Sequence, residues 1–250
     1  MASARDDAPF AGRIALVTGA SGGIGAELGR RLADSGAVVA LHYASNEAAA
    51  TALAAEIGAA GGRARTFGAD LGDASAPERL VGRVERELGP VDVLAANAGL
   101  SRPGSWEEVD AEAFDETVAV NLRAPYLLAR RVLPGMRERE YGRILFTSSV
   151  AALTGGIVGP HYASSKAGLH GLTHFLASRV AADGVTVNAI APALIEDTGM
   201  LPGDPGELAQ VVPIGRLGKS ADVADLALAM LRNGYLTSKV VMLDGGIHPR

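Results

Sequence analysis

The chain alternates short, strongly apolar runs with longer alanine-rich segments from one end to the other. The apolar runs are rich in Val, Ile and Leu and lack a polar face, which predicts strands that are buried on both sides. The longer segments have the length and periodicity of helices. Expected strands cover 13–18, 37–43, 63–69, 91–96, 142–148, 185–190 and 239–243, and expected helices cover 23–35, 46–60, 74–88, 112–139, 161–183 and 220–232.

This order predicts an α/β fold, a single doubly wound Rossmann-type domain whose seven-stranded parallel sheet carries helices on both faces. No linker or break in composition divides residues 1–250, and we expect residues 1–11 to form an N-terminal tail. Two loops rich in Pro and Gly, 101–105 and 201–206, follow the carboxyl ends of strands, where open α/β sheets bind ligands. The second lies in a long connection, and we predict that residues 194–212 form a substrate lid.

The composition narrows the class of protein. The chain has 48% hydrophobic and 20% charged residues and a formal net charge of -5, which argues against a nucleic-acid or anionic-membrane partner. It has no cysteine, so disulfides and thiolate metal sites are excluded. The N-terminus does not resemble a secretory signal, and no stretch approaches the ~20 apolar residues of a membrane span. We therefore expect a cytoplasmic protein.

The first expected strand runs into the sequence TGASGGIGAELG, in which Gly19, Gly22, Gly23 and Gly25 surround the start of a helix. Glycine tolerates positive φ and lets the backbone approach a pyrophosphate, whose charge a helix N-terminus attracts. A plain tight turn would explain the glycines alone. Their place between a strand and a helix favours a dinucleotide site.

Tyr162 and Lys166 are four residues apart in an expected helix, so their side chains are neighbours on one face. A nearby cation favours the phenolate form, which would make the tyrosine a proton donor and acceptor near neutral pH. The spacing alone also fits an ordinary helix residue followed by a solvated lysine, so other motifs must decide.

Four features add to the glycine turn: Asn97-Ala98-Gly99 after the fourth expected strand, Asn121 in the next helix, Ser148-Ser149 after the fifth strand, and Tyr162-x-x-x-Lys166. Together they resemble the short-chain dehydrogenase/reductase family from about residue 12 to residue 246. Stretches such as VNLRAPYLLAR and PIGRLGKSADVADLALAML are most similar to its 3-oxoacyl-(acyl-carrier-protein) reductases.

The resemblance implies four catalytic residues. Tyr162 would be the general acid in ketone reduction, Lys166 would lower the pKa of Tyr162 and hold the nicotinamide ribose, and Ser149 would polarise the carbonyl. Asn121 would hold a water in a proton relay behind Lys166, although a local helix-distorting role is the alternative. Ser148 is the alternative to Ser149, because the end of a strand is uncertain by a residue.

The resemblance also implies contacts with NADP(H) along the carboxyl edge of the sheet. The predicted contact residues are Gly19, Ser21, Gly22, Gly23, Ile24, Tyr43, Ser45, Asn46, Asp70, Leu71, Asn97, Gly99, Tyr162, Lys166, Pro192, Ile195 and Thr198. Asp70 has the alternative of capping the next helix. Ala193 stands where the family pattern has Gly, which puts the local backbone conformation in question, and Thr198 is one position from its common place.

The end of the second strand predicts that NADPH is preferred over NADH. An NAD enzyme places Asp or Glu there, and that carboxylate would repel a 2′-phosphate. Here Tyr43 takes the position, and Ser45 and Asn46, which follow, can donate hydrogen bonds unless they only cap the next helix. Gly22 stands where many NADP-using relatives carry a basic residue, so the preference could be modest.

We therefore expect an NADP(H)-dependent oxidoreductase that reduces a ketone, such as a 3-oxoacyl thioester, to a secondary alcohol. The alternatives are a sugar, steroid or small-alcohol dehydrogenase of the same family, and a cofactor-binding protein without catalysis. Whether acyl carrier protein presents the substrate stays open, and the family habit implies a homotetramer. No metal site is predicted, because His170 and His174 have the spacing of zinc ligands without the following general-base Glu.

Overall fold

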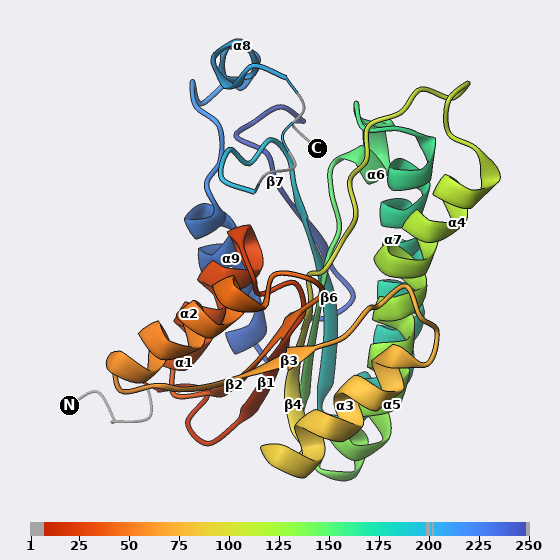
Figure 1. Ribbon diagram of the computed structural model, residues 1–250. Helices are drawn as coiled ribbons and strands as arrows, with labels where there is room; N and C mark the ends of the chain where they lie inside the picture. Colours follow the sequence, from red (N-terminus) through yellow and green to blue (C-terminus); the bar gives the residue numbers. More distant parts are fainter. Residues whose placement is uncertain (1–7, 199–200, 202, 249–250) are drawn as a thin grey trace.

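The structure is a computed structural model and describes residues 8–198, 201 and 203–248. Its centre is a sheet of seven parallel strands in the order β3-β2-β1-β4-β5-β6-β7 (Figure 1). The strands are β1 (Ile14–Val17), β2 (Val38–Tyr43), β3 (Arg63–Gly68), β4 (Val91–Ala96), β5 (Gly142–Thr147), β6 (Val185–Pro192) and β7 (Val240–Leu243). The predicted seven-stranded parallel sheet is confirmed. The strand order changes direction between β1 and β4, where ligands of doubly wound folds bind.

Helices cover both faces of this sheet (Figure 1). One face carries α1 (Gly23–Asp34), α2 (Glu47–Ala59) and α9 (Ser220–Arg232), and the other carries α3 (Ala76–Glu87), α5 (Ala124–Glu138) and α7 (Pro160–Val180). The short elements are α4 (Ala111–Val118), α6 (Ala151–Thr154), α8 (Pro205–Gln210) and a 3₁₀ turn, η2 (Ala181–Asp183).

Alternate residues of each strand build two separate cores. In β1, Ile14 and Leu16 pack with the helices α3, α5 and α7, whereas Ala15 and Val17 pack with α1, α2 and α9. All four are buried, which is why the strand reads as an unbroken apolar run in the sequence.

One expected helix, 112–139, has an interruption. The helix α4 continues into a π-helical turn, η1 (Ala119–Arg123), and α5 follows directly. A π turn holds one residue more than an α turn and is typical of functional sites. Asn121 lies in the middle of this turn. The helix is therefore distorted at a residue that the sequence analysis places in the active site.

The N-terminal tail is shorter than predicted. Residues 1–7 lie outside the described part of the chain, but Phe10 is buried with the core of α1. Its amide donates a hydrogen bond to the Ser35 carbonyl at 2.9 Å. An aromatic ring buried in this way contributes about 1.5–3 kcal/mol, so this end of the chain is part of the fold.

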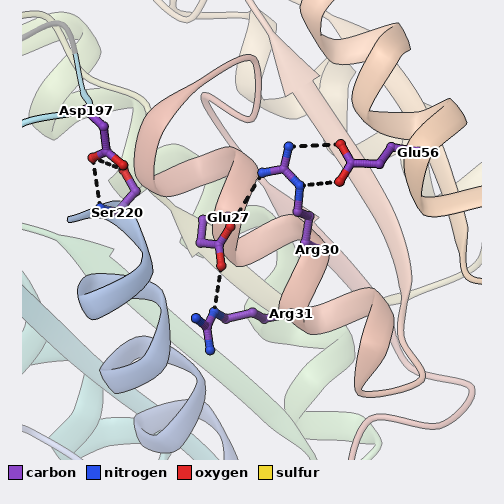
Figure 2. Close-up of polar contacts among 6 residues, drawn as sticks. All are labelled: Glu27, Arg30, Arg31, Glu56, Asp197 and Ser220. Atoms are coloured by element: carbon purple, nitrogen blue, oxygen red, sulfur yellow. Dashed lines mark hydrogen bonds and ion pairs between the residues drawn. The ribbon is translucent and has the colours of Figure 1, made fainter. Parts of the chain in front are cut away.

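Ion pairs tie α1 to its two neighbours, and Figure 2 shows the pair with α2. Arg30 Nε and Nη2 donate hydrogen bonds to the two carboxylate oxygens of Glu56 in α2, at 2.7 and 3.0 Å. Within α1, Arg31 Nε donates to Glu27 Oε1 at 3.0 Å. Arg31 also pairs with Asp225 of α9. The helix that begins at the glycine turn is thereby held by residues far apart in the sequence.

Candidate active site

A cavity of about 900 Å³ runs along the carboxyl ends of the strands. One end is bounded by the glycine turn and the residues after β2 and β3. The middle is bounded by the ends of β4, β5 and β6 and by the first turns of α7. The other end is closed by residues of 150–158 and of the predicted lid. The predicted residues that line this cavity are Gly19, Ser21, Gly22, Gly23, Ile24, Ser45, Asp70, Leu71, Asn97, Gly99, Ser149, Tyr162, Lys166, Pro192, Ile195 and Thr198.

The glycine turn has the conformation that its sequence predicts. Gly19 and Gly23 have φ angles of 67° and 50°, which other residues adopt only with strain. A Cβ atom on Gly25 would lie 2.2 Å from the Gly19 carbonyl oxygen, so helix and turn approach too closely for a side chain. No side chain caps the N-terminus of α1, and its first turn has no acidic residue. The helix amides are therefore free to receive an anion such as a pyrophosphate.

Asn97 joins this turn to the centre of the sheet. Its Nδ2 donates to the carbonyl oxygen of Thr18 at 3.1 Å, and its Oδ1 accepts from the Thr147 hydroxyl at 3.3 Å. The Thr18 hydroxyl accepts in turn from the amides of Asn97 and Ala98, each at 3.0 Å. These bonds tie β1, β4 and β5 together where the cavity crosses the sheet.

His42 is a cavity residue that the sequence analysis missed. It is 1% exposed, and its Nδ1 accepts a hydrogen bond from the Gly19 amide at 3.1 Å. Since Nδ1 is the acceptor, Nε2 carries the proton and donates to the Ala69 carbonyl at 3.0 Å. Burial lowers the pKa of His42, which favours this neutral form. The ring therefore links the glycine turn to the chain after β3.

The predicted pair on α7 lies in the middle of the cavity. The helix begins at Pro160, and Lys166 Nζ stands 5.6 Å from the centroid of the Tyr162 ring. Lys166 is 4% exposed and donates a hydrogen bond to the Thr147 carbonyl at 2.7 Å. Burial lowers the pKa of this amine to about 8.

The predicted lowering of the Tyr162 pKa is contradicted. Burial raises the pKa of this phenol, and a hydrogen bond with Ser149 opposes the shift only in part. The ammonium of Lys166 is directed to a backbone carbonyl rather than to the phenol oxygen. In this arrangement Tyr162 keeps its proton at neutral pH, as a proton donor must.

The structure distinguishes the two neighbouring serines. Ser149 is the one hydrogen-bonded with Tyr162, and its Oγ also accepts from the Ala151 amide at 3.2 Å. Ser148 Oγ instead donates to the Lys166 carbonyl at 3.1 Å and contacts His170 Nε2 at 2.8 Å. Ser149 therefore faces the reacting groups, and Ser148 fastens β5 to α7.

Asn121 lies behind Lys166 and does not line the cavity. It is fully buried, its Nδ2 donates to the Leu100 carbonyl at 3.0 Å and to Ser165 Oγ at 3.1 Å, and its Oδ1 accepts from the Leu100 amide at 2.7 Å. Both amide hydrogens are thus used inside the protein. The side chain clamps the loop after β4 onto α7. A relay water would therefore have to hydrogen-bond the main chain of Asn121 or the second lone pair of its Oδ1.

The residues after β2 divide into two groups. Ser45 lines the cavity together with Ala44, which the prediction did not include. Tyr43 packs against Gly68, and Asn46 caps α2 by accepting from the Ala49 amide at 3.1 Å, so neither lines the cavity. Asp70 does line it and does not cap α3, because its Oδ1 accepts from the Gly72 amide at 2.9 Å.

The chain after β6 borders the middle of the cavity. Ala193 adopts the conformation without a positive φ, so the missing glycine needs no strained backbone there. Thr198 Oγ1 donates to the Ile195 carbonyl at 3.1 Å, and a Cβ on Gly23 would lie 3.3 Å from the Thr198 Cα. The root of the predicted lid thus rests against the glycine turn. Asp197 secures it further by accepting from the amide and hydroxyl of Ser220 at 2.8 and 2.7 Å (Figure 2).

Many of the missed cavity residues are apolar, among them Leu100, Val120, Val150, Ala151, Ile157, Val158 and Ile247. The predicted lid adds Leu194, Leu201, Leu208 and Val211. Residues 199–200 and 202 of the predicted lid lie outside the described residues, whereas α8 and its flanks supply Leu208 and Val211. The composition of these segments is rich in turn-forming residues and indicates loops. It does not indicate which side chains point into the cavity.

The two spaced histidines do not converge. His170 contacts Ser148, whereas His174 Nδ1 contacts Ser238 Oγ at 3.0 Å. Within the described part of the chain, no three His, Cys, Asp or Glu residues gather in a way that could hold a metal ion. None of the described helices is long and apolar enough to cross a membrane.

The glycine turn, the clamp around Asn121 and the Tyr162 and Lys166 pair define one site, and comparison with known proteins identifies its class. A sequence profile described as short chain dehydrogenase matches residues 13–205. The chain therefore belongs to the short-chain dehydrogenase family.

Relatives extend over nearly the whole chain. It is 36% identical to the 3-oxoacyl-(acyl-carrier-protein) reductase of Escherichia coli K12, over 96% of this chain and 98% of that protein. It is 35% identical to the acetoacetyl-CoA reductase of Rhizobium meliloti, over 94% and 98%.

Solved structures agree with this assignment. A blue fluorescent protein from a metagenomic library, in complex with NADPH, has a TM-score of 0.89 and 36% identity, covering 95% of this chain and 98% of its own. A short-chain dehydrogenase/reductase from Serratia marcescens has the same TM-score at 32% identity, covering 96% and 99%.

Proposed function

We propose that the protein is an NADP(H)-dependent oxidoreductase that reduces a ketone, a 3-oxoacyl thioester or a similar carbonyl, to a secondary alcohol. The observation that carries this proposal is the hydrogen-bonded pair Tyr162 and Ser149, which faces the same cavity as the glycine turn. A bound nicotinamide cofactor would supply the hydride.

The side chains of the site suit the reductive direction. Tyr162 holds its proton, because burial raises its pKa, and would deliver it to the carbonyl oxygen of the substrate. Ser149 lies beside it as a second donor that stabilises negative charge on that oxygen. Lys166 is charged below pH about 8 and would hold the nicotinamide ribose from the floor of the cavity.

The residues present also fit the cofactor. The uncapped N-terminus of α1 and the positive φ angles of Gly19 and Gly23 form a cradle for the pyrophosphate. Ser21 and Ser45 line the cavity where the adenosine 2′-phosphate would lie. Glu47 hydrogen-bonds Tyr43 close by, so we expect a preference for NADPH that is real but limited.

The family resemblance leads us to propose a cytoplasmic homotetramer as well. Three exposed aromatic side chains on α4, α5 and α7, Phe114, Tyr126 and Phe175, support burial of these helices between subunits. Size-exclusion chromatography with light scattering tests the tetramer, and a mass of about one subunit would contradict it.

The variant Tyr162→Phe tests the catalytic proposal. It removes the proton donor and keeps the ring, so turnover of a ketone with NADPH should fall by at least ~10²-fold while NADPH affinity stays nearly unchanged. Tyr235→Phe is the matched control, because Tyr235 is 98% exposed. Near wild-type turnover in Tyr162→Phe would refute the assignment.

A further inference from the structure

The entrance to the substrate end of the cavity is strongly acidic, whereas its interior is apolar. We propose that the physiological substrate is a free, uncharged carbonyl compound with an apolar body, and that substrates carried on coenzyme A or on acyl carrier protein are disfavoured. This inference rests on the proposed function and names the substrate class of that same site.

The interior suits an apolar body. Beyond Tyr162 the walls are formed largely by aliphatic side chains from four separate segments of the chain, among them Val120, Ile157, Leu208 and Ile247. Ile157 and Val211 are 62% and 65% exposed, although both line the cavity. An apolar substrate would cover this surface and remove it from water, which favours binding.

The rim carries the opposite character. Two segments border this end of the cavity, residues 101–118 with α4 and residues 201–218 with α8, and Figure 1 places α4 and α8 at the same end of the sheet. These segments contain eight of the 28 acidic residues of the chain but only two of its 23 Lys and Arg residues. The remaining chain carries 20 acidic and 21 basic residues and is close to neutral, so the negative charge is concentrated at the rim.

Both arginines of the rim are already paired. Arg102 Nη1 lies 2.6 Å from Glu116 Oε2, and Arg216 contacts both carboxylate oxygens of Asp222 at 2.6 and 3.2 Å. Neither is available as a free cation for a phosphate of coenzyme A. Glu116, the partner of Arg102, is itself one of the residues that line the cavity.

Several of the acidic side chains are held in place by the fold. Asp110 caps α4 by accepting from the Ala113 amide at 2.9 Å, and Asp204 caps α8 by accepting from the Gly206 amide at 2.9 Å. Glu108 accepts from the Ser105 amide at 2.8 Å, a bond that lowers the pKa of this carboxyl. These hydrogen bonds fix the positions of the carboxylates, so the place of their charge is set by the fold.

Fixed negative charge repels the phosphates of coenzyme A and the acidic surface of a carrier protein over distances of roughly one Debye length, about 30 Å at 0.01 M salt. An uncharged ketone is not affected. The rim therefore selects by charge and the interior by apolar contact, although both relatives named above act on thioesters by their names.

The test compares three substrates with one acyl chain and saturating NADPH: ethyl 3-oxohexanoate, the N-acetylcysteamine thioester of 3-oxohexanoate, and 3-oxohexanoyl-coenzyme A. The two thioesters differ in the phosphates and in the size of the carrier. At low ionic strength we expect kcat/KM of the uncharged thioester to exceed that of the coenzyme A thioester by at least about tenfold. Adding ~0.5 M salt should lower the ratio of these two kcat/KM values by at least about threefold.

A rim variant tests the cause. Glu107→Lys with Glu207→Lys reverses one exposed charge on each side of the entrance and should raise kcat/KM for the coenzyme A thioester about tenfold, with little change for the uncharged thioester. Asp34→Lys with Glu138→Lys is the matched control. Both positions are exposed at the carboxyl ends of α1 and α5, which lead into the amino ends of β2 and β5, whereas the cavity lies at the carboxyl ends of the strands. This control should change neither value.

The outcomes separate the two proposals. A kcat/KM for the coenzyme A thioester equal to or above that of the uncharged thioester would overturn the substrate inference and leave the proposed function intact. Discrimination that persists unchanged in the rim variant and in high salt would overturn it too, because it would trace to the size of the carrier. Inactivity on all three ketones would overturn the proposed function and the inference with it.

Discussion

His42 offers the sharpest test of how the cofactor turn is held in place. Its buried ring accepts from the Gly19 amide and donates to the Ala69 carbonyl. The variant His42→Ala removes both bonds. The variant His42→Asn restores one of them, because the amide oxygen of Asn lies where Nδ1 lies in His and can accept from Gly19.

The structure sets the size of the effect. A buried backbone group that loses its partner costs about 1–3 kcal/mol. In His42→Ala the Gly19 amide is one such group, and it belongs to the turn that would hold the pyrophosphate. When this cost destabilises the NADPH-bound conformation of the turn, the Kd for NADPH should rise roughly 5–150-fold, because about 1.4 kcal/mol corresponds to a tenfold change in Kd. His42→Asn should keep the affinity within about threefold of wild type.

Protonation of His42 should have a similar effect. A protonated ring has donors on both nitrogens, so Nδ1 can no longer accept from Gly19. The pKa of His42 is lowered by burial in the folded protein, so the unfolded chain binds more protons as the pH falls below about 6.5. The free energy of unfolding should therefore decrease as the pH falls through this range towards the folded pKa, and His42→Asn should lose this part of the dependence.

The assay is a fluorescence titration of NADPH into wild type, His42→Ala and His42→Asn at pH 7.5 and at pH 5.5, with urea unfolding on the same samples. Turnover at saturating NADPH should change less than about threefold, since the ring does not contact Tyr162 or Ser149 in any bond described above. Equal NADPH affinity in all three proteins at both pH values would refute the role of His42.

Three further predictions follow from the same geometry. Gly25→Ala places a Cβ 2.2 Å from the Gly19 carbonyl oxygen, so we expect at least a tenfold weaker NADPH affinity and a lower thermal midpoint, and wild-type binding would contradict the close approach. Lys166→Ala should reduce both turnover and NADPH affinity. In wild type that affinity should fall as the pH rises through about 8, where the buried amine of Lys166 loses its charge, and a flat titration from pH 7 to pH 9.5 would count against it. Steady-state kinetics on one ketone should give a kcat/KM about tenfold higher with NADPH than with NADH, and a ratio of one or below would show that Ser21 and Ser45 do not select the phosphate.

Local sequence patterns predicted the features that depend on local structure. The glycine turn follows from φ angles and from the junction of a strand with a helix, and the Tyr162 and Lys166 pair follows from helix geometry. The sheet and its two layers of helices follow from runs such as 13–18, which are apolar on both faces.

Features that depend on long-range contacts were missed. His42 looks like any residue of a buried strand until the fold brings Gly19 and Ala69 to its two nitrogens. The direction of the Tyr162 pKa depends on how deeply α7 is buried and on where Lys166 Nζ is directed, which spacing does not specify. The π turn at Asn121 adds one residue to a helix, a change that the periodic pattern does not reveal, and helix distortion entered the sequence analysis only as the alternative role of Asn121.

The ion pair between Arg31 and Asp225 has a consequence for how the protein is made. The two residues are 194 positions apart, so among the described helices α1 is synthesised first and its partner α9 last. At ~5–20 residues per second, a ribosome needs about 10–40 s to cover that distance. During this interval the side of α1 that α9 covers has no native partner, and a nascent chain that stops before Ser220 exposes it permanently. We expect such truncated chains to aggregate or to be degraded rather than to fold into a smaller nucleotide-binding domain.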